Sequence, residues 1–179
     1  SSNTYLGYLA GTAGTVGGSN VAVGINALST NQGGSRNVAI GSDALRVFNS
    51  GATVSNTYNV AIGYEAMELL TTGITNVAVG GFALKNITTH QHNTAVGYSA
   101  LTSATNGSHN VALGHDALTS ATTSGNNTAV GSEALEDTTT GGSNVAIGRQ
   151  ALANNTTASN NTAVGYSSLY SNTTGTENV

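Results

Sequence analysis

Charged residues are scarce in this chain of 179 residues, and three residue types are missing altogether. Only 7% of the residues are Asp, Glu, Lys or Arg, whereas globular proteins average about 25%. With four basic residues and a net charge of −4, the chain lacks the cationic surface that attracts nucleic acids and anionic membranes. It contains no proline, tryptophan or cysteine. Because cysteine is missing, the chain can form neither a disulfide framework nor a thiolate zinc site.

Long hydrophobic runs are missing as well. No stretch approaches the roughly 18 consecutive apolar residues of a membrane-spanning helix, so we expect no membrane insertion. Hydrophobic residues still make up 38% of the chain, and with so small a net charge this composition argues against disorder. The arrangement of these residues therefore decides the fold.

A motif of the form Asn-(Val/Thr)-Ala-(Val/Ile/Leu)-Gly recurs along the whole chain. Its copies are 17 residues apart, except for one step of 22 residues that carries a five-residue insertion within residues 47–58. Such a strict period is the signature of a repeat architecture, so we treat residues 1–179 as one repeat domain of about ten coils. The Asn that opens each full copy, numbered position 1, is found at Asn20, Asn37, Asn59, Asn76, Asn93, Asn110, Asn127, Asn144 and Asn161.

Each position of the repeat predicts a structural role. Positions 2 to 4 are short and rich in β-branched residues, which favours a strand. The invariant Gly at position 5 suits a corner with positive φ or a close approach to another strand. The Asn side chains of position 1 are expected to hydrogen-bond from coil to coil in a structural ladder. The aliphatic residues of position 4 and the Leu of position 9 are predicted to line the core: Val23, Leu28, Ile40, Leu45, Ile62, Val79, Leu84, Val96, Leu101, Leu113, Leu118, Val130, Leu135, Ile147, Leu152, Val164 and Leu169.

These patterns predict an all-β fold, a β-solenoid or parallel β-roll with one coil per repeat. A helix–turn–helix repeat needs about 33 residues, and Gly inside helices would cost up to about 1 kcal/mol each. Ala at position 8 and Leu at position 9 are expected to open a second short strand. Because each coil supplies few large apolar side chains, a single chain buries little. We therefore predict a parallel homotrimeric rod in which the Ala of position 3 or position 8 packs between chains.

The repeats resemble those of a known family. The segments NVAIGSDAL (residues 37–45), NTAVGYSAL (residues 93–101) and NVALGHDAL (residues 110–118) are similar to the head repeats of trimeric autotransporter adhesins and to repeats of bacteriophage tail fibres. This resemblance implies a left-handed parallel β-roll, three chains per rod and an adhesive role at a bacterial or virion surface. The adhesin repeat is shorter, so the extra residues are expected to enlarge one loop per coil.

Position 6 varies while the scaffold around it stays constant, and such positions are where recognition often lies. The position offers a candidate binding ridge formed by Tyr64, Tyr98, His115, Arg149 and Tyr166, although solvated variation on an exposed edge explains the same pattern. A host-surface glycan or a protein receptor is the partner that such a ridge would suit.

Two further features could bear on binding. His90 and His92 form an H-x-H pair that three parallel chains could bring to a transition metal on their axis, although two loop histidines are the plainer explanation. Otherwise we expect no cofactor. The insertion brings Phe48 and Tyr58 into a larger loop, which is either a contact loop or a tolerated bulge, and we favour the bulge.

The sequence offers little for catalysis. It contains no G-x-S-x-G, Walker or H-E-x-x-H motif, and its acids are dispersed, so we expect no enzyme. We expect instead an extracellular fibre segment at a cell or virion surface, with itself as first partner. The alternative is an extracellular filament subunit whose coils stack end to end through open sheet edges.

Overall fold

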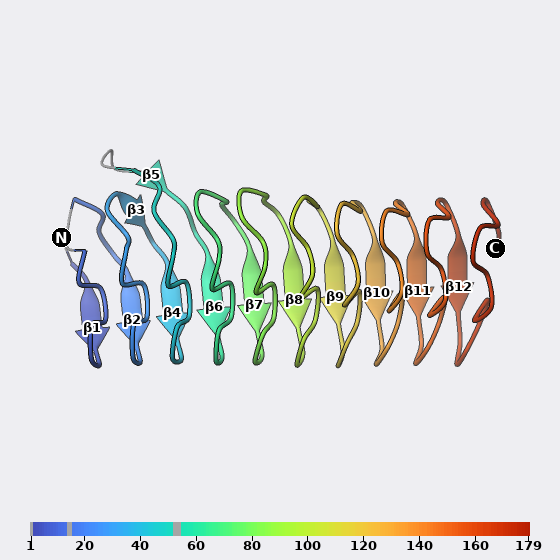
Figure 1. The fold of residues 1–179 in the computed structure, drawn as a ribbon, viewed down its shortest axis with the longest axis horizontal. Coiled ribbons are helices and arrows are strands. Elements are labelled where there is room, and N and C mark those ends of the chain that lie inside the picture. The colour runs from blue at the N-terminus through green and yellow to red at the C-terminus, as the bar shows by residue number, and fades with distance from the viewer. Residues whose placement is uncertain (1, 14–15, 52–54) are drawn as a thin grey trace.

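In the computed structural model, residues 2–13, 16–51 and 55–179 are described, and within them the fold is all-β with no helix. One three-residue strand from each repeat joins a single parallel sheet (Figure 1). Its strands, in spatial order, are β1 (Thr4–Leu6), β2 (Val21–Val23), β4 (Val38–Ile40), β6 (Val60–Ile62), β7 (Val77–Val79), β8 (Thr94–Val96), β9 (Val111–Leu113), β10 (Thr128–Val130), β11 (Val145–Ile147) and β12 (Thr162–Val164).

Every strand pairs with the equivalent strand of the next repeat, position for position. Thr94, Ala95 and Val96 of β8, for example, face Val111, Ala112 and Leu113 of β9. The result is a β-solenoid of about nine turns with a spacing of about 17 residues, as predicted. The coils lie side by side along the long axis of the molecule, with the termini at opposite ends (Figure 1).

The core inside the coils is built from small side chains and from the large residue of position 9, with a second large residue in some coils. The Ala residues of positions 3 and 8 are almost completely buried throughout the central coils. The trimer contact predicted through these alanines is therefore wrong, because both line the interior of their own coil. The Leu of position 9 is buried as predicted in Leu28, Leu45, Leu84, Leu101, Leu118, Leu135 and Leu152, and Leu169 packs partly against the same core.

The prediction that position 4 lines the core is wrong. Successive residues of a strand point to opposite faces, and the narrow interior accepts the Ala of position 3, so positions 2 and 4 both point outward. Ile40 and Val96 each expose 38% of their surface, and Val164 exposes 66%. The aliphatic residues that lie on the outside of the sheet are Val23, Ile40, Ile62, Val79, Val96, Leu113, Val130, Ile147 and Val164.

Position 12 contributes a core residue that the sequence pattern did not reveal. Phe48, Leu70 and Ile87 are fully buried there, and Ala104 and Ala121 are almost so. The next two coils place Thr138 and Asn155 at the same buried position, where the Nδ2 of Asn155 donates a hydrogen bond to the carbonyl of Ala158. The side of the core formed by position 12 thus changes along the rod, from the polar Asn31 through large apolar side chains and then Ala to the polar Thr138 and Asn155.

The predicted Asn ladder is present. The backbone N–H and the Nδ2 of Asn110 both donate to the Oδ1 of Asn93, at 3.0 and 3.2 Å, and Nδ2 also donates to the carbonyl of Ser124. Asn127 repeats the arrangement on the Oδ1 of Asn110. These side chains are almost completely buried, and buried polar groups of this kind are stable only when hydrogen-bonded.

Each coil turns at the position-5 glycine, whose φ in the central coils lies between +131° and +146°. The Leu and Met of position 9 and the residues of positions 7 and 17 also have positive φ. The second short strand expected at positions 8 and 9 is therefore absent from the described residues. Positions 7 and 9 have positive φ while position 8 between them does not, so the backbone there is not extended. Coil-to-coil hydrogen bonds continue nevertheless, as from the N–H of Leu118 to the carbonyl of Ala134.

The insertion lies outside the register of the solenoid. Phe48, expected in the loop, is instead a core residue, so the extra residues come after it; residues 52–54 lie outside the described part of the chain. Two short strands, β3 (Gly34–Ser35) and β5 (Ser55–Asn56), pair as a separate parallel sheet. Tyr58 closes the loop at position 17, where its hydroxyl accepts a hydrogen bond from Arg36.

Replacing a corner glycine should separate backbone strain from coil stacking. A Cβ at Gly114 would lie 2.4 Å from the carbonyl oxygen of Gly131, whereas a Cβ at Gly165, with a similar φ of +125°, meets nothing within 4 Å. Gly165→Ala should therefore cost the strain alone, about 1–3 kcal/mol, and Gly114→Ala substantially more. Urea unfolding of both variants measures the difference, and equal losses would show that close stacking is unimportant.

Removal of one amide from the Asn ladder should be costly. Asn110→Ala leaves the carbonyl of Ser124 and the N–H groups of Asn127 without their partner, and each buried unpaired group costs about 1–3 kcal/mol. Asn106→Ala changes an exposed amide in the preceding coil and should stay within about 0.5 kcal/mol of the parent. Thermal and urea unfolding compare the two, and similar stabilities would refute a structural role for the ladder.

Candidate functional site

The corner glycine places the residues of positions 6 and 7 along one edge of the solenoid, which we call the edge ridge. The position-7 N–H donates to the position-6 carbonyl of the preceding coil, as from Asp116 to Tyr98 at 3.1 Å and from Glu133 to His115 at 2.9 Å. Many of the side chains at position 6 are exposed, Tyr64 at 51% and Tyr98 at 53% among them. The scaffold therefore holds a row of variable side chains in a fixed, solvent-facing line.

Four rings of the edge ridge form a continuous stack, which we call the aromatic ladder: Tyr64, Phe82, Tyr98 and His115. Phe82 packs edge to face between Tyr64 and Tyr98, with centroid distances of 5.4 and 5.5 Å. Tyr98 then stacks on His115 at 5.6 Å with only 13° between the ring planes. Such aromatic pairs contribute about 0.5–1.5 kcal/mol each, so the ladder is a stable feature of the surface.

The structure brings together only part of the predicted ridge. Tyr64, Tyr98 and His115 belong to the aromatic ladder, whereas Arg149 and Tyr166 lie further along the same edge. Phe82 is an additional member that a search of position 6 alone could not find, because it stands at position 7. Its coil has Gly81 at position 6, so no side chain there competes with the ring of Phe82.

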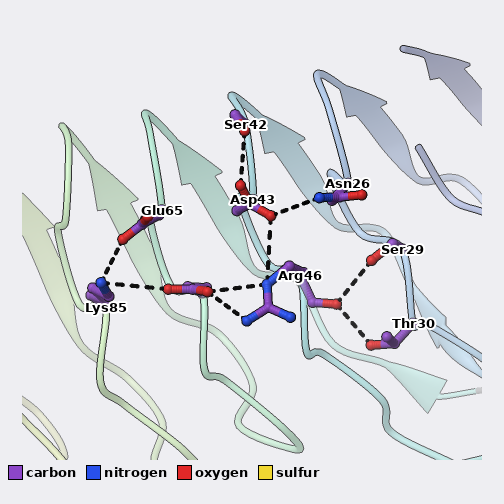
Figure 2. Close-up of polar contacts among 9 residues, drawn as sticks. Asn26, Ser29, Thr30, Ser42, Asp43, Arg46, Glu65 and Lys85 are labelled. Atoms are coloured by element: carbon purple, nitrogen blue, oxygen red, sulfur yellow. Dashed lines mark hydrogen bonds and ion pairs between the residues drawn. The ribbon is translucent and has the colours of Figure 1, made fainter. Parts of the chain in front are cut away.

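A network of ion pairs joins neighbouring coils (Figure 2). The Nζ of its Lys85 lies 5.2 Å from the Phe82 ring centroid of the aromatic ladder. Arg46 binds Glu68 through Nε and Nη2, at 3.0 and 2.6 Å, and Lys85 binds Glu65 and, at 3.6 Å, Glu68. Asp43 lies 3.5 Å from Arg46 and accepts hydrogen bonds from Asn26 and Ser42. Three consecutive coils thus alternate positive and negative charge at position 10.

This network shifts the ionisation of its members. The hydrogen bond from Lys85 holds the pKa of the Glu65 carboxyl below its usual value, and the same contact raises the pKa of Lys85. The Glu65 carboxylate raises the pKa of the Tyr64 hydroxyl, to which it is hydrogen-bonded. Further along the rod, burial raises the pKa of the Glu136 carboxyl, and the charge of neighbouring Asp137 adds to the effect.

The two histidines of the predicted metal pair have different neighbours in the single chain. His90 places its Nδ1 3.3 Å from the hydroxyl of Thr89. The ring of His92 lies instead 5.0 Å from that of His109 in the next coil, and its Nδ1 lies 2.8 Å from the hydroxyl of Thr75. Across the described part of the chain, no group of three or more His, Cys, Asp or Glu side chains is placed to hold a metal ion. A metal at His90 and His92 stays a prediction.

The outward-facing side chains of positions 2 and 4 form a second surface, which we call the outer sheet face. In the main-sheet strands from β2 onward, position 2 carries Val or Thr and position 4 carries Val, Ile or Leu, and none of these residues is fully buried. Parallel sheets in proteins are normally covered on both faces. The outer sheet face, uncovered in the single chain, is therefore a candidate interaction surface.

The ion pair of Lys85 should stabilise the fold only while both partners are charged. Its contribution is present above the ordinary Glu pKa of about 4.3 and is lost as the pH falls through the lowered pKa of Glu65. Lys85→Met should therefore lower the free energy of unfolding by at most about 1 kcal/mol near neutral pH and by less near pH 2. Arg149→Met, which breaks a longer pair with Glu133 at 3.7 Å, is the matched control with a smaller effect. Urea unfolding at both pH values measures this, and a pH-independent loss would contradict it.

Comparison with known proteins does not assign this chain to a family. The described residues contain no helix long and apolar enough to cross a membrane. No family model, no curated protein and no solved structure matches the chain. The edge ridge and the outer sheet face are therefore the features of the chain that bear on its function.

Proposed function

We propose that this chain is a structural and adhesive segment of an extracellular surface fibre, such as an adhesin head or a phage tail-fibre shaft. Three parallel copies associate through their outer sheet faces, and the edge ridges remain exposed to a receptor. The proposed role is presentation of a binding surface, without catalysis and without a bound cofactor.

The observation that carries this proposal is the apolar character of the outer sheet face. Position 4 is aliphatic in every coil although it faces outward, and Ile40, Val96 and Ile147 remain between 38% and 42% exposed. Burial of such side chains contributes about 25 cal/mol per Å² of apolar surface, and repetition along the rod multiplies it. A second and a third copy of the same chain match the face in length and periodicity.

The fibre function follows from repetition. A coil-to-coil hydrogen-bonded rod holds its side chains at fixed spacing, so weak contacts along the edge ridge act together. Three copies per fibre multiply these contacts further by raising the effective concentration of each site near the receptor. In such a fibre, the constant residues hold the coils together and the variable residues of the edge ridge contact the receptor.

A second candidate is a filament in which subunits stack end to end. It is favoured by the terminal strands, since β1 and β12 each have one edge without a partner strand among the described residues; on that edge of β12 the N–H of Thr162 already donates to the carbonyl of Asn178. Unpaired edges with free backbone N–H and C=O groups template pairing with another chain. Assembly in solution distinguishes this arrangement from lateral association.

The mass of the purified chain in solution tests the proposal. Light scattering coupled to size exclusion should give three times the mass of one chain. Val96→Lys, which places a charge in the middle of the outer sheet face, should convert the assembly to a folded monomer. Thr89→Lys, on an exposed turn, should leave the mass unchanged. A stable monomer for the parent chain would overturn the fibre proposal, and a very large polydisperse species would favour the filament.

A further inference from the structure

We infer that the aromatic ladder is the binding site for a single strand of an uncharged linear polysaccharide, lying parallel to the rod axis over four coils. This inference rests on the proposed function, in which the edge ridge faces outward. It assigns a chemical class to the receptor and confines the site to Tyr64, Phe82, Tyr98 and His115.

The spacing of the rings supports a polymeric ligand. Successive ring centroids are 5.4, 5.5 and 5.6 Å apart, close to the length of one residue in an extended, equatorially linked sugar chain. A pyranose ring presents an apolar C–H face that packs against an aromatic side chain, burying surface from both. Phe82 stands at 87° to both Tyr64 and Tyr98, so a chain of such sugars meets rings of alternating orientation and packs mainly on the exposed rings of Tyr64 and Tyr98.

Polar groups lie beside the rings and can bind sugar hydroxyls. Glu65 adjoins Tyr64 in the sequence, and Asp116 adjoins His115. The carboxylate of Asp116 lies 2.9 Å from the Nδ1 of His115. Lys85 places its ammonium 5.2 Å from the Phe82 ring centroid. Each partner is already held by a neighbour, so the hydrogen-bonding groups are positioned before the ligand arrives, which reduces the entropic cost of binding.

The charge of the edge ridge selects an uncharged ligand. The nearby cations are neutralised, since Lys85 is paired with Glu65 and Glu68 and Arg46 is paired with Glu68. The chain as a whole carries a net charge of −4. An acidic polysaccharide would meet carboxylates without a free cation to offset its charge, and it would bind more weakly.

The backbone of the edge ridge argues against an extended peptide as the ligand. Peptides that add to a protein edge use free main-chain groups. Here the position-7 N–H groups of Phe82, Ser99 and Asp116 already donate to the preceding coil, at 2.9 to 3.1 Å. Side-chain stacking is therefore the interaction that the ridge offers, and a sugar chain uses it without needing main-chain hydrogen bonds.

Affinity electrophoresis in native gels tests the inference. The parent protein should be retarded by hydroxyethyl cellulose or by galactomannan, two uncharged linear polysaccharides, and not by alginate, an acidic one. Tyr98→Ala, which removes the central exposed ring, should weaken retardation by about tenfold, the equivalent of about 1.4 kcal/mol. Tyr170→Ala removes a ring that is 39% exposed and stands at position 10, outside the edge ridge, and it should change binding by less than about twofold.

Failure of this inference is distinguishable from failure of the proposed function. No retardation by either uncharged polysaccharide, or equal effects of Tyr98→Ala and Tyr170→Ala, would overturn the glycan site. The solution mass of the parent and of both variants is measured in parallel. A threefold mass without polysaccharide binding leaves the fibre proposal standing, whereas retardation of a monomer supports the site and refutes the fibre.

Discussion

The structure depends on hydrogen bonding between identical positions of successive coils. Such stacking requires successive coils to approach so closely at position 5 that a Cβ on Gly114 would overlap the carbonyl of Gly131 in the next coil. It also sustains positive φ at non-glycine residues such as Leu118 and Asp116, a conformation that costs about 1–3 kcal/mol for each such residue. Because coil-to-coil hydrogen bonds restrain these residues, the strain persists without unwinding the solenoid.

Much of the fold could be predicted from the period of the sequence, but the direction of its side chains could not. The invariant Gly, the Asn ladder and the buried Leu of position 9 follow from residue types that suit only one environment. Position 4 was misjudged because apolar residues are not confined to interiors. In a strand of three residues, the small Ala95 fits the narrow core, and Val96 must then face outward. Position 12 was missed because its occupants range from Phe48 to Asn155, so they share no recognisable type.

The sequence could predict that the candidate site runs along one edge of the solenoid, but it could not predict which side chains contact one another there. Position 6 correctly places Tyr64, Tyr98 and His115 on one edge, since an in-register solenoid aligns equivalent residues. It could not reveal Phe82, because that ring reaches the line from position 7 in the coil where Gly81 leaves a gap. Nor could it reveal that His92 packs on His109, since that contact joins two coils, whereas the H-x-H pattern lies within one.

The insertion after Phe48 shows where this architecture tolerates change. Despite the extra residues, the N–H of Asn59 still donates to the Oδ1 of Asn37 at 2.9 Å, and Val60 still pairs with Val38. Thr57 donates to the same Oδ1 and so completes the ladder at the altered step. Additional polypeptide can thus be accommodated at this side of a coil without shifting the stacking of its neighbours. Lengthening of that turn therefore gives the rod a route to diversify, or a point for grafting a foreign peptide, while the shaft keeps its pitch.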